Sequence, residues 1–203
     1  MIVEERKALL RRTERARAGR SVPKEEFAGK SLSVQENFVS AFPPKAGMRI
    51  GLYKAVGVEV GTDHIRGCCH AAGALLFYPK VMDDGHLSFY PDGGSDGWVR
   101  GKYGLLEPRV EPGTEGVRRG FDLVVVPGMA FDAEGRRLGK GYGYYDRFLS
   151  GLAGTAVTVG LAFSRQVVPE VPVDSRDVPV DAVVTEEGVI RVSRVRPKGT
   201  TIK

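Results

Sequence analysis

The sequence has few of the residues that build disulfide frameworks or sulfur- and nitrogen-based metal sites. Among its 203 residues are two cysteines, adjacent at Cys68 and Cys69, and three histidines at the separate positions 64, 70 and 86. Two neighbouring thiols make neither a disulfide framework nor a structural zinc site, and we expect both to be buried in a helix or strand. The histidines lack the spacing of metal ligands. The composition therefore excludes a disulfide-rich scaffold and argues against a His-based metal centre.

Long apolar stretches are also missing. The longest stretch without a charged residue, Phe148 to Ser164, is rich in glycine and threonine, and it is too short and too polar to cross a bilayer. The first residues, MIVEERKALLRR, carry charges where a secretion signal would have its apolar segment. We therefore expect a cytoplasmic protein with no membrane partner.

The residues that are present describe an ordinary globular chain. With 42% hydrophobic and 27% charged residues, 203 residues can bury one core, so we expect a single domain over 1–203. Lys and Arg number 30 against 25 Asp and Glu, a net charge of +5 that suits an anionic ligand. A basic chain can also bind RNA, but the basic residues lack the interleaved aromatic side chains on which bases stack. We expect no nucleic-acid partner.

The N-terminal part, residues 1–42, is predicted to be helical. Residues 3–18 combine leucines and alanines with six basic residues, a pattern typical of an amphipathic helix whose basic face points outward. Ser21, Pro23 and two following glutamates indicate the start of a second helix that runs toward Phe38 and ends before Pro43.

From Met48 onward, short apolar runs alternate with possible helices. The runs are MRIGLYKAV, ALLFYPKV, HLSFY, DLVVVPGMAF, TAVTVGLAF and DAVVTEEGVI, each of strand length and several apolar on both faces. Residues 62–72 and 144–152 are the helix candidates between them. The alternation predicts an α/β fold with a mostly parallel sheet, and the basic tail, 193–203, is expected to be frayed.

The segment richest in chemistry is FDLVVVPGMAFDAEGRRLGKGYGYYDRFL, residues 121–149, which predicts a strand, a glycine-rich basic loop and a helix. Gly139, Gly141 and Gly143 allow backbone amides to turn toward an anion without obstruction by side chains. The helix that follows adds its positive N-terminal end. Arg136, Arg137 and Lys140 flank the glycines and can neutralise phosphate charge. This spacing differs from the two common phosphate fingerprints, so a charged surface turn remains the alternative.

Acidic and basic residues elsewhere are candidates for the same site. Asp146 follows the loop, either as a helix N-terminal charge or as a Mg²⁺ ligand. Asp174, Asp177 and Asp181 lie in a proline-rich segment, where acids are usually solvated turn residues. Lys7 and Arg11, spaced i and i+4, share one helical face and could bind one anion, the alternative being a solvated basic face.

Taken together, these segments resemble the 5-formyltetrahydrofolate cyclo-ligase family, also called 5,10-methenyltetrahydrofolate synthetase. The most specific match is VPGMAFDAEGRRLGKGYGYYDRFL, residues 126–149. Shorter matches follow in family order: KALLR (7–11), EVGT (59–62), YPKV (78–81), KYGLLEP (102–108) and AFSRQVVPEVPVDSRDVPVD (162–181). The resemblance covers nearly the whole chain.

The resemblance implies a three-layer α/β/α Rossmann-like sandwich and the ATP-dependent conversion of 5-formyltetrahydrofolate to 5,10-methenyltetrahydrofolate, with release of ADP and phosphate. In the family's mechanism the formyl oxygen attacks the γ-phosphorus, and N10 then closes the ring as phosphate leaves. Mg²⁺ would accompany ATP as the co-substrate. Two other functions stay open, a relative that binds nucleotide or folate without turnover and an RNA-binding protein. Oligomeric state is not encoded in these motifs, and we expect a monomer or weak dimer.

The resemblance also assigns roles to individual residues. It implies catalytic roles for Lys7, Arg137, Lys140 and Tyr144. It implies ATP binding by Lys7, Arg11, Arg137, Leu138, Gly139, Lys140, Gly141, Tyr142, Gly143, Tyr144 and Tyr145. Folate binding would fall to Glu59, Lys80, Trp98 and Tyr144, with Glu59 accepting paired N–H contacts from the pterin ring. Asp146 and Asp177 would hold Mg²⁺, with Asp174 as the alternative to Asp177.

Overall fold

The computed structural model describes residues 2–18, 23–94, 96–101, 106–152 and 154–193. It contains four α-helices: α1 (Val3–Ala18), α2 (Lys24–Ala41), α3 (Asp63–Ala71) and α4 (Tyr144–Leu152), with a short 3₁₀ turn at Ser164–Gln166. All four confirm helices predicted from the sequence. None of the helices in the described residues is both long and apolar enough to cross a membrane.

A seven-stranded sheet forms the centre of the molecule. Its strands are β1 (Arg49–Gly51), β2 (Leu75–Val81), β3 (Leu87–Pro91), β6 (Leu123–Val126), β9 (Val157–Leu161), β10 (Ala182–Thr185) and β11 (Gly188–Arg191). The spatial order is β11-β10-β9-β6-β1-β2-β3. Neighbours from β10 to β2 are parallel, and only the edge strands β11 and β3 pair antiparallel. The mostly parallel sheet is confirmed.

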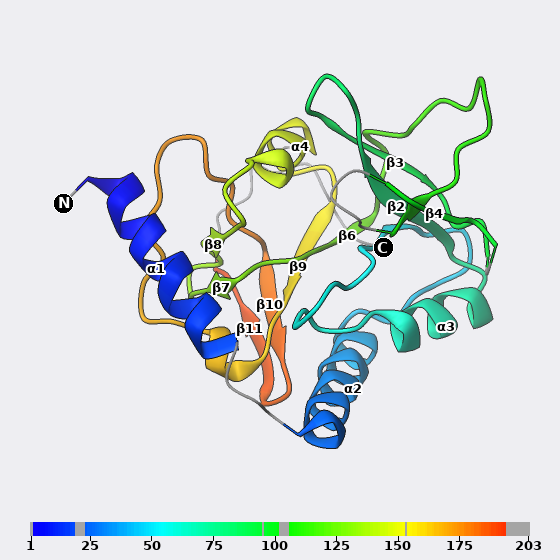
Figure 1. The fold of residues 1–203 in the computed structure, drawn as a ribbon. Coiled ribbons are helices and arrows are strands. Elements are labelled where there is room, and N and C mark those ends of the chain that lie inside the picture. Colours follow the sequence, from blue (N-terminus) through cyan, green and yellow to red (C-terminus); the bar gives the residue numbers. More distant parts are fainter. Residues whose placement is uncertain (1, 19–22, 95, 102–105, 153, 194–203) are drawn as a thin grey trace.

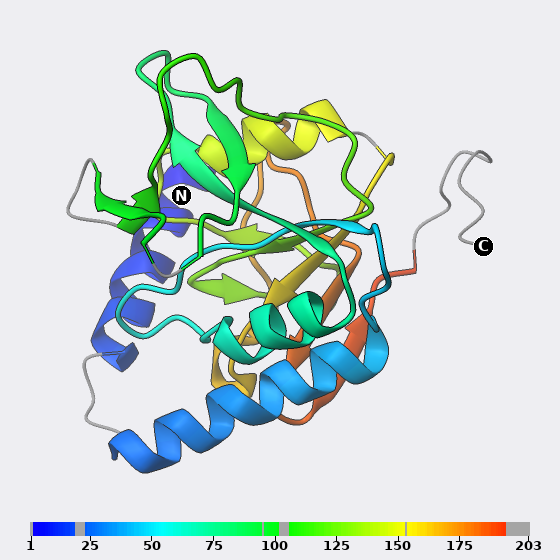
Figure 2. The same ribbon diagram turned by 90° about the vertical axis from the view of Figure 1, so that its right-hand side faces the viewer.

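The helices cover the two faces of this sheet. Figure 2 shows α2 and α3 on one side and α4 on the other. The strand β6 explains why both faces are covered, since its four residues are all buried and alternate between the two sides. Leu123 and Val125 belong to the core cluster under α2 and α3, whereas Val124 and Val126 belong to the cluster that contains Phe148 of α4. The fold is the expected three-layer α/β/α sandwich.

Two small hairpins extend from the sheet. One pairs β4 (Trp98–Arg100) with β5 (Leu106–Pro108), and the other pairs β7 (Ala130–Phe131) with β8 (Arg137–Leu138). The second hairpin is set close to the sheet, because a Cβ atom at Gly160 of β9 would overlap the Phe131 ring. After this hairpin, which lies beside α1, the chain continues through the glycine-rich loop to α4 (Figure 1).

The helix α1 lies beside this hairpin, separate from α2 and α3 (Figure 1). The expectation of an outward basic face is only partly right, because Lys7 and Glu14 are buried. Lys7 turns inward to two carboxylates of the segment 171–178, which offset the cost of removing its charge from water.

Three further expectations need correction or stay open. Cys69 is buried, but Cys68 is only half-buried on α3, on the side turned away from the core. The run DAVVTEEGVI forms two strands instead of one, because the chain reverses at Glu186 and Glu187, and Gly188, which opens β11, has a φ of 138° that favours glycine. Ser21 and residues 194–203 lie outside the described residues, so the helix start at Ser21 and the frayed tail stay predictions.

Candidate active site

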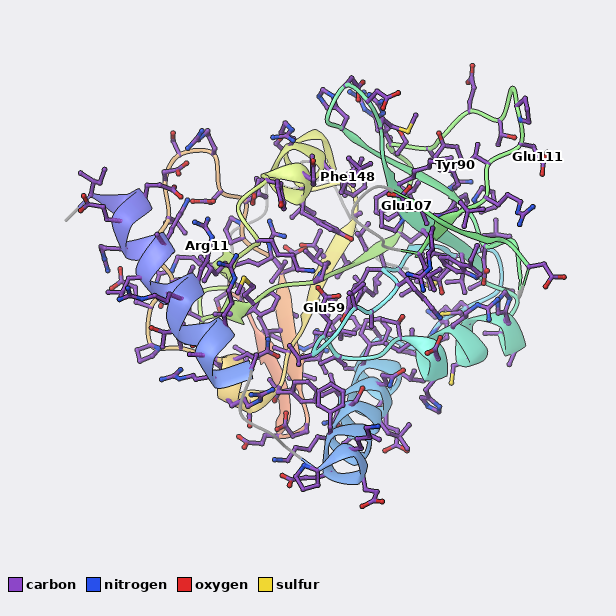
Figure 3. The ribbon with its side chains drawn as sticks, in the orientation of Figure 1. Arg11, Glu59, Tyr90, Glu107, Glu111 and Phe148 are labelled. Carbon is purple, nitrogen blue, oxygen red and sulfur yellow. The ribbon has the colours of Figure 1, made fainter. Side chains whose placement is uncertain are left out.

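A cavity of about 790 Å³ opens at the carboxyl ends of β1, β2 and β6. In the sheet, β1 lies between β2 and β6: the next strands in the chain, β2 and β3, lie on one side of it, and the later strands, from β6 on, lie on the other. The strand order therefore reverses at β1. Open α/β sheets bind ligands at such a reversal. Tyr53, two residues after β1, and Pro127 with Gly128, directly after β6, line the cavity. In Figure 3, Arg11 extends from α1 toward the centre of the molecule, where Glu59 lies, and Glu107 lies farther over toward β2 and β4.

The hairpin β7–β8 presents one of its two adjacent arginines to this cavity. Arg137 lines the cavity with a side chain that is 3% exposed, and its Nη2 donates to Asp146 Oδ1 at 2.7 Å. The guanidinium also lies 5.5 Å from the Tyr145 ring centre. Arg136, which precedes β8, turns back toward the β7–β8 turn, where its Nε donates to Asp132 Oδ2 at 2.6 Å. It pairs with the fully buried Asp132 and lies outside the cavity lining, so the expectation that it neutralises a ligand there is wrong.

The glycine-rich loop forms the next wall. Gly141 and Gly143 have φ angles of 107° and 67°, a region that side chains other than glycine rarely adopt. Arg11 of α1 closes the loop from outside, with its Nε donating to Gly139 O at 3.1 Å. A Cβ atom added at Gly141 would touch this guanidinium. The loop therefore has a backbone geometry that favours glycine and lies against a basic side chain, and the cradle of backbone amides stays a prediction.

Beyond the loop, Lys7 joins the helix α1 to two acids. Its Nζ donates to Asp174 Oδ2 at 2.8 Å and to Asp177 Oδ2 at 2.5 Å. Burial lowers the pKa of Lys7, but the hydrogen bonds and charges of the two carboxylates outweigh it and raise the pKa above its ordinary value. Hydrogen bonds from Arg176 and Lys7 lower the pKa of Asp174. The lysine is held as a cation between two carboxylates.

The acid Asp146 approaches the same segment from α4. Its Oδ1 accepts a long hydrogen bond from the Val178 backbone N–H at 3.4 Å, next to Asp177. Asp146, Asp174 and Asp177 all line the cavity. No set of three or more His, Cys, Asp or Glu side chains within the described residues is arranged to hold a metal ion unaided. A cation here would therefore need oxygen ligands from a bound molecule or water.

The cavity lining also includes Glu59, next to the glycine-rich loop. Its Oε1 lies 2.9 Å from Lys140 Nζ, and its Oε2 accepts the Val56 backbone N–H at 2.9 Å. The Tyr145 hydroxyl in this region is buried and has no hydrogen-bond partner among the described residues. Burial and, next to it, the charge of Glu59 raise the pKa of Tyr145, so the hydroxyl keeps its proton.

Aromatic rings wall the remaining side. The Trp98 ring packs edge-on against the buried Tyr78, with ring centres 4.7 Å apart, and Lys54 Nζ lies 5.5 Å from the Trp98 ring centre. Tyr142 and Tyr144 stack with centres 5.5 Å apart. These rings offer a flat apolar surface to a planar ligand.

The structure brings together nearly all residues that the sequence singled out. The cavity lining includes Lys7, Arg11, Glu59, Trp98, Asp146, Asp177 and every residue from Arg137 to Tyr145. Three of the candidates, Lys80, Arg136 and Asp181, do not line the cavity, although the neighbours of Lys80 on β2, Pro79 and Val81, do. Sequence reasoning gave no role to Tyr53 or to the buried Glu107, which also line it. For Glu107 a signal existed, since it belongs to the segment KYGLLEP.

Comparison with known proteins agrees with this geometry. The family model "5-formyltetrahydrofolate cyclo-ligase family" matches residues 3–186. A mouse 5-formyltetrahydrofolate cyclo-ligase is 29% identical over 184 residues, which is 83% of this chain and 88% of that protein. An Escherichia coli protein of the same name is 32% identical over 143 residues, 69% of this chain and 79% of that one.

A solved structure is similar over the full length. The 5,10-methenyltetrahydrofolate synthetase of Aquifex aeolicus superposes with a TM-score of 0.78 at 32% sequence identity, covering 100% of this chain and 97% of that chain. The family model covers most of the chain, and the motifs of the sequence line one cavity. This chain therefore belongs to the 5-formyltetrahydrofolate cyclo-ligase family.

Proposed function

We propose that the protein catalyses the ATP-dependent cyclisation of 5-formyltetrahydrofolate to 5,10-methenyltetrahydrofolate, releasing ADP and phosphate. The observation that carries the proposal is that a single cavity joins the basic glycine-rich loop to the wall formed by Glu59 and Trp98. Its volume of about 790 Å³ is in the range of cavities that hold drug-sized ligands. The family membership supports the same reaction.

The phosphate end would lie between α1 and the glycine-rich loop. Phosphoryl transfer needs positioning and charge neutralisation more than covalent chemistry by the protein. The amides of Gly139 to Gly143 and the cations of Lys7, Arg11 and Lys140 supply donors on both sides of a triphosphate. Arg137, nearly buried beside Asp146, would hold charge where the γ-phosphate is transferred.

Mg²⁺ fits this end by the chemistry of its donors. Mg²⁺ prefers oxygen ligands and is commonly held by one or two carboxylates together with substrate phosphates. Asp146 and Asp177 line the cavity beside the loop and would hold it, with Asp174 adjacent to both. When bound, the ion would neutralise phosphate charge and orient the transferred group.

The folate would occupy the end with Glu59, Trp98 and Tyr144. A carboxylate can accept two N–H groups from the 2-amino-4-oxo edge of the pterin. The formyl oxygen would then face the γ-phosphorus, and its phosphorylation turns a poor leaving oxygen into a good one. N10 attacks the activated carbon, loses its proton, and closes the ring as phosphate departs. We place this reaction in the cytoplasm and in a monomer or weak dimer.

The experiment is to mix purified protein with Mg·ATP and 5-formyltetrahydrofolate and follow the absorbance of methenyltetrahydrofolate. We expect one ADP for each ring closed and no product without ATP. ATP consumption that ignores the folate, or binding of both ligands without product, would refute the proposed reaction. Steeply salt-dependent RNA binding that folate leaves unchanged would support an RNA-binding protein instead.

A further inference from the structure

Three cations predicted to bind phosphates each already have an acidic partner in the cavity. Lys7 contacts Asp177, Arg137 contacts Asp146, and Lys140 contacts Glu59. The first two pairs belong wholly to the phosphate end. The third pair is different, because it joins a residue of the glycine-rich loop to the residue that is expected to bind the pterin.

We propose that Lys140 is a positioning residue that couples the folate end of the cavity to its phosphate end. In the free protein Glu59 holds the Lys140 ammonium, and a pterin that takes up Glu59 releases Lys140 to the phosphates. This inference rests on the proposed function, since it assumes that both ligands bind in this cavity.

The hydrogen bonds of Glu59 explain why the two contacts compete. Its two carboxylate oxygens are both in use, one by the Val56 backbone N–H and the other by Lys140. A pterin edge that donates two N–H groups must approach both oxygens, and it therefore competes with the Lys140 ammonium for access to one of them. The backbone N–H of Val56 is fixed by its loop, whereas the Lys140 side chain is 53% exposed and has rotamers to move through. The lysine is the partner that leaves.

The same exchange works in the opposite direction. A phosphate that attracts Lys140 leaves Glu59, whose side chain is 16% exposed, as a carboxylate without its counter-ion. A mostly buried charge that loses its partner gains more from new donors than a solvated one does. ATP therefore strengthens folate binding by the same factor by which folate strengthens ATP binding, as linkage requires.

The exposure of the pair sets the size of the effect. Ion pairs of Lys with a carboxylate contribute little when they are exposed and more as they become buried. Lys140 is half exposed and Glu59 is mostly buried, so we expect this pair to change ligand affinity by about two- to fivefold.

The experiment measures the Kd of a non-hydrolysable ATP analogue with Mg²⁺, with and without saturating 5-formyltetrahydrofolate, by titration calorimetry. For the wild-type protein we expect tighter analogue binding when the folate is present. In Lys140→Met the ratio of the two Kd values should fall by about two- to fivefold, while Lys140→Arg should keep most of it. In Glu59→Gln, without folate, the analogue should bind about two- to fivefold more tightly than to wild type, because Lys140 is free.

A matched control is available on α2. Lys30 Nζ lies 2.9 Å from Glu26 Oε1, and the lysine side chain is 47% exposed, close to the value for Lys140. Lys30 does not line the cavity. Lys30→Met should therefore leave the ratio of the two Kd values unchanged. A lower ratio in this variant would show that the effect comes from net charge, and it would refute the coupling through Lys140.

Two results would overturn the inference while leaving the proposed function intact. One is wild-type turnover with no difference between the two Kd values. The other is a Lys140→Met variant whose ratio of the two Kd values equals that of the wild type, together with a Glu59→Gln variant that binds the analogue as tightly as the wild type does. Thermal unfolding of each variant shows whether it is folded. Lys140→Met changes an exposed side chain, so this variant still tests the inference if Glu59→Gln does not fold. Failure of the wild-type protein to make product would instead count against the proposed function.

Discussion

The substitution Asp146→Ala should destabilise the protein as well as remove a predicted Mg²⁺ ligand. The Asp146 carboxylate is 2.7 Å from Arg137 Nη2, and the arginine side chain is only 3% exposed. Arg137 Nε already lacks a hydrogen-bond partner among the described residues. Removing one partner of a buried ion pair costs about 3–5 kcal/mol because the other charge stays buried. Since Asp146 is itself 19% exposed, we expect the lower end, about 3 kcal/mol.

This loss is measurable without any ligand. For a chain of 203 residues, a change of about 1 kcal/mol shifts the Tm by about 2–4 °C, so Asp146→Ala should lower the Tm by about 6–12 °C. The double variant Arg137→Met with Asp146→Ala should recover part of the loss, since no charge is then left unpaired. A Tm within 2 °C of wild type for Asp146→Ala, or a double variant that is less stable than the sum of the single ones, would refute this reasoning.

Other substitutions separate binding from stability. Lys7→Ala should weaken the binding of the ATP analogue more than that of 5-formyltetrahydrofolate in calorimetric titrations, and equal losses would indicate a displaced α1 instead. Gly141→Val should weaken nucleotide binding, because the φ of 107° at this position disfavours a β-branched residue. Gly139→Ala serves as the control, since a Cβ atom there meets open space. If both variants bind the ATP analogue with the same affinity, the loop does not act as a phosphate cradle. The lowered pKa of Asp174 predicts that its stabilising contribution is present above about pH 4 and is lost as pH falls through the folded-state pKa. The raised pKa of Lys7 predicts a contribution lost only above about pH 10. The free energy of unfolding, measured with a chemical denaturant, should therefore not change with pH between about pH 5 and 9 on account of these two groups. A strong pH dependence in this range that disappears in Lys7→Met would refute the assignment.

Much of the fold follows from local patterns. The run of buried valines in β6, bounded by Asp122 and Pro127, can only be a strand covered on both faces, and Pro43 ends the preceding helical part. The order of the strands could not be predicted in this way, because periodicity tells which faces are buried and not which strands are neighbours. The position of β1 between β6 and β2, which creates the reversal beside the cavity, became visible only in three dimensions.

The site was predictable where its residues are contiguous. The segment from Arg137 to Asp146 carries its own glycines, cations and acid, so its role could be inferred from spacing and resemblance. The pairing of Lys7 with Asp177 joins residues 170 positions apart, and nothing in either segment predicts the contact. Arg136 was misjudged because two adjacent arginines were treated alike, although only Arg137 lines the cavity and Arg136 instead pairs with Asp132.

The pairing of cations and acids also bears on which anions the cavity accepts. A free phosphate that attracts Lys7 leaves Asp177 without its cation, and one that attracts Arg137 leaves Asp146 without its cation. Binding of the phosphate must then offset the loss of a nearly buried ion pair. A triphosphate that brings Mg²⁺ supplies anionic oxygens to the cations and a cation to the acids in one step. We therefore expect nucleotide binding to depend on Mg²⁺ more steeply than phosphate charge alone requires. Titration of the ATP analogue over a range of Mg²⁺ concentrations measures this, and an affinity that is the same with and without Mg²⁺ would show that the acids and cations do not exchange partners.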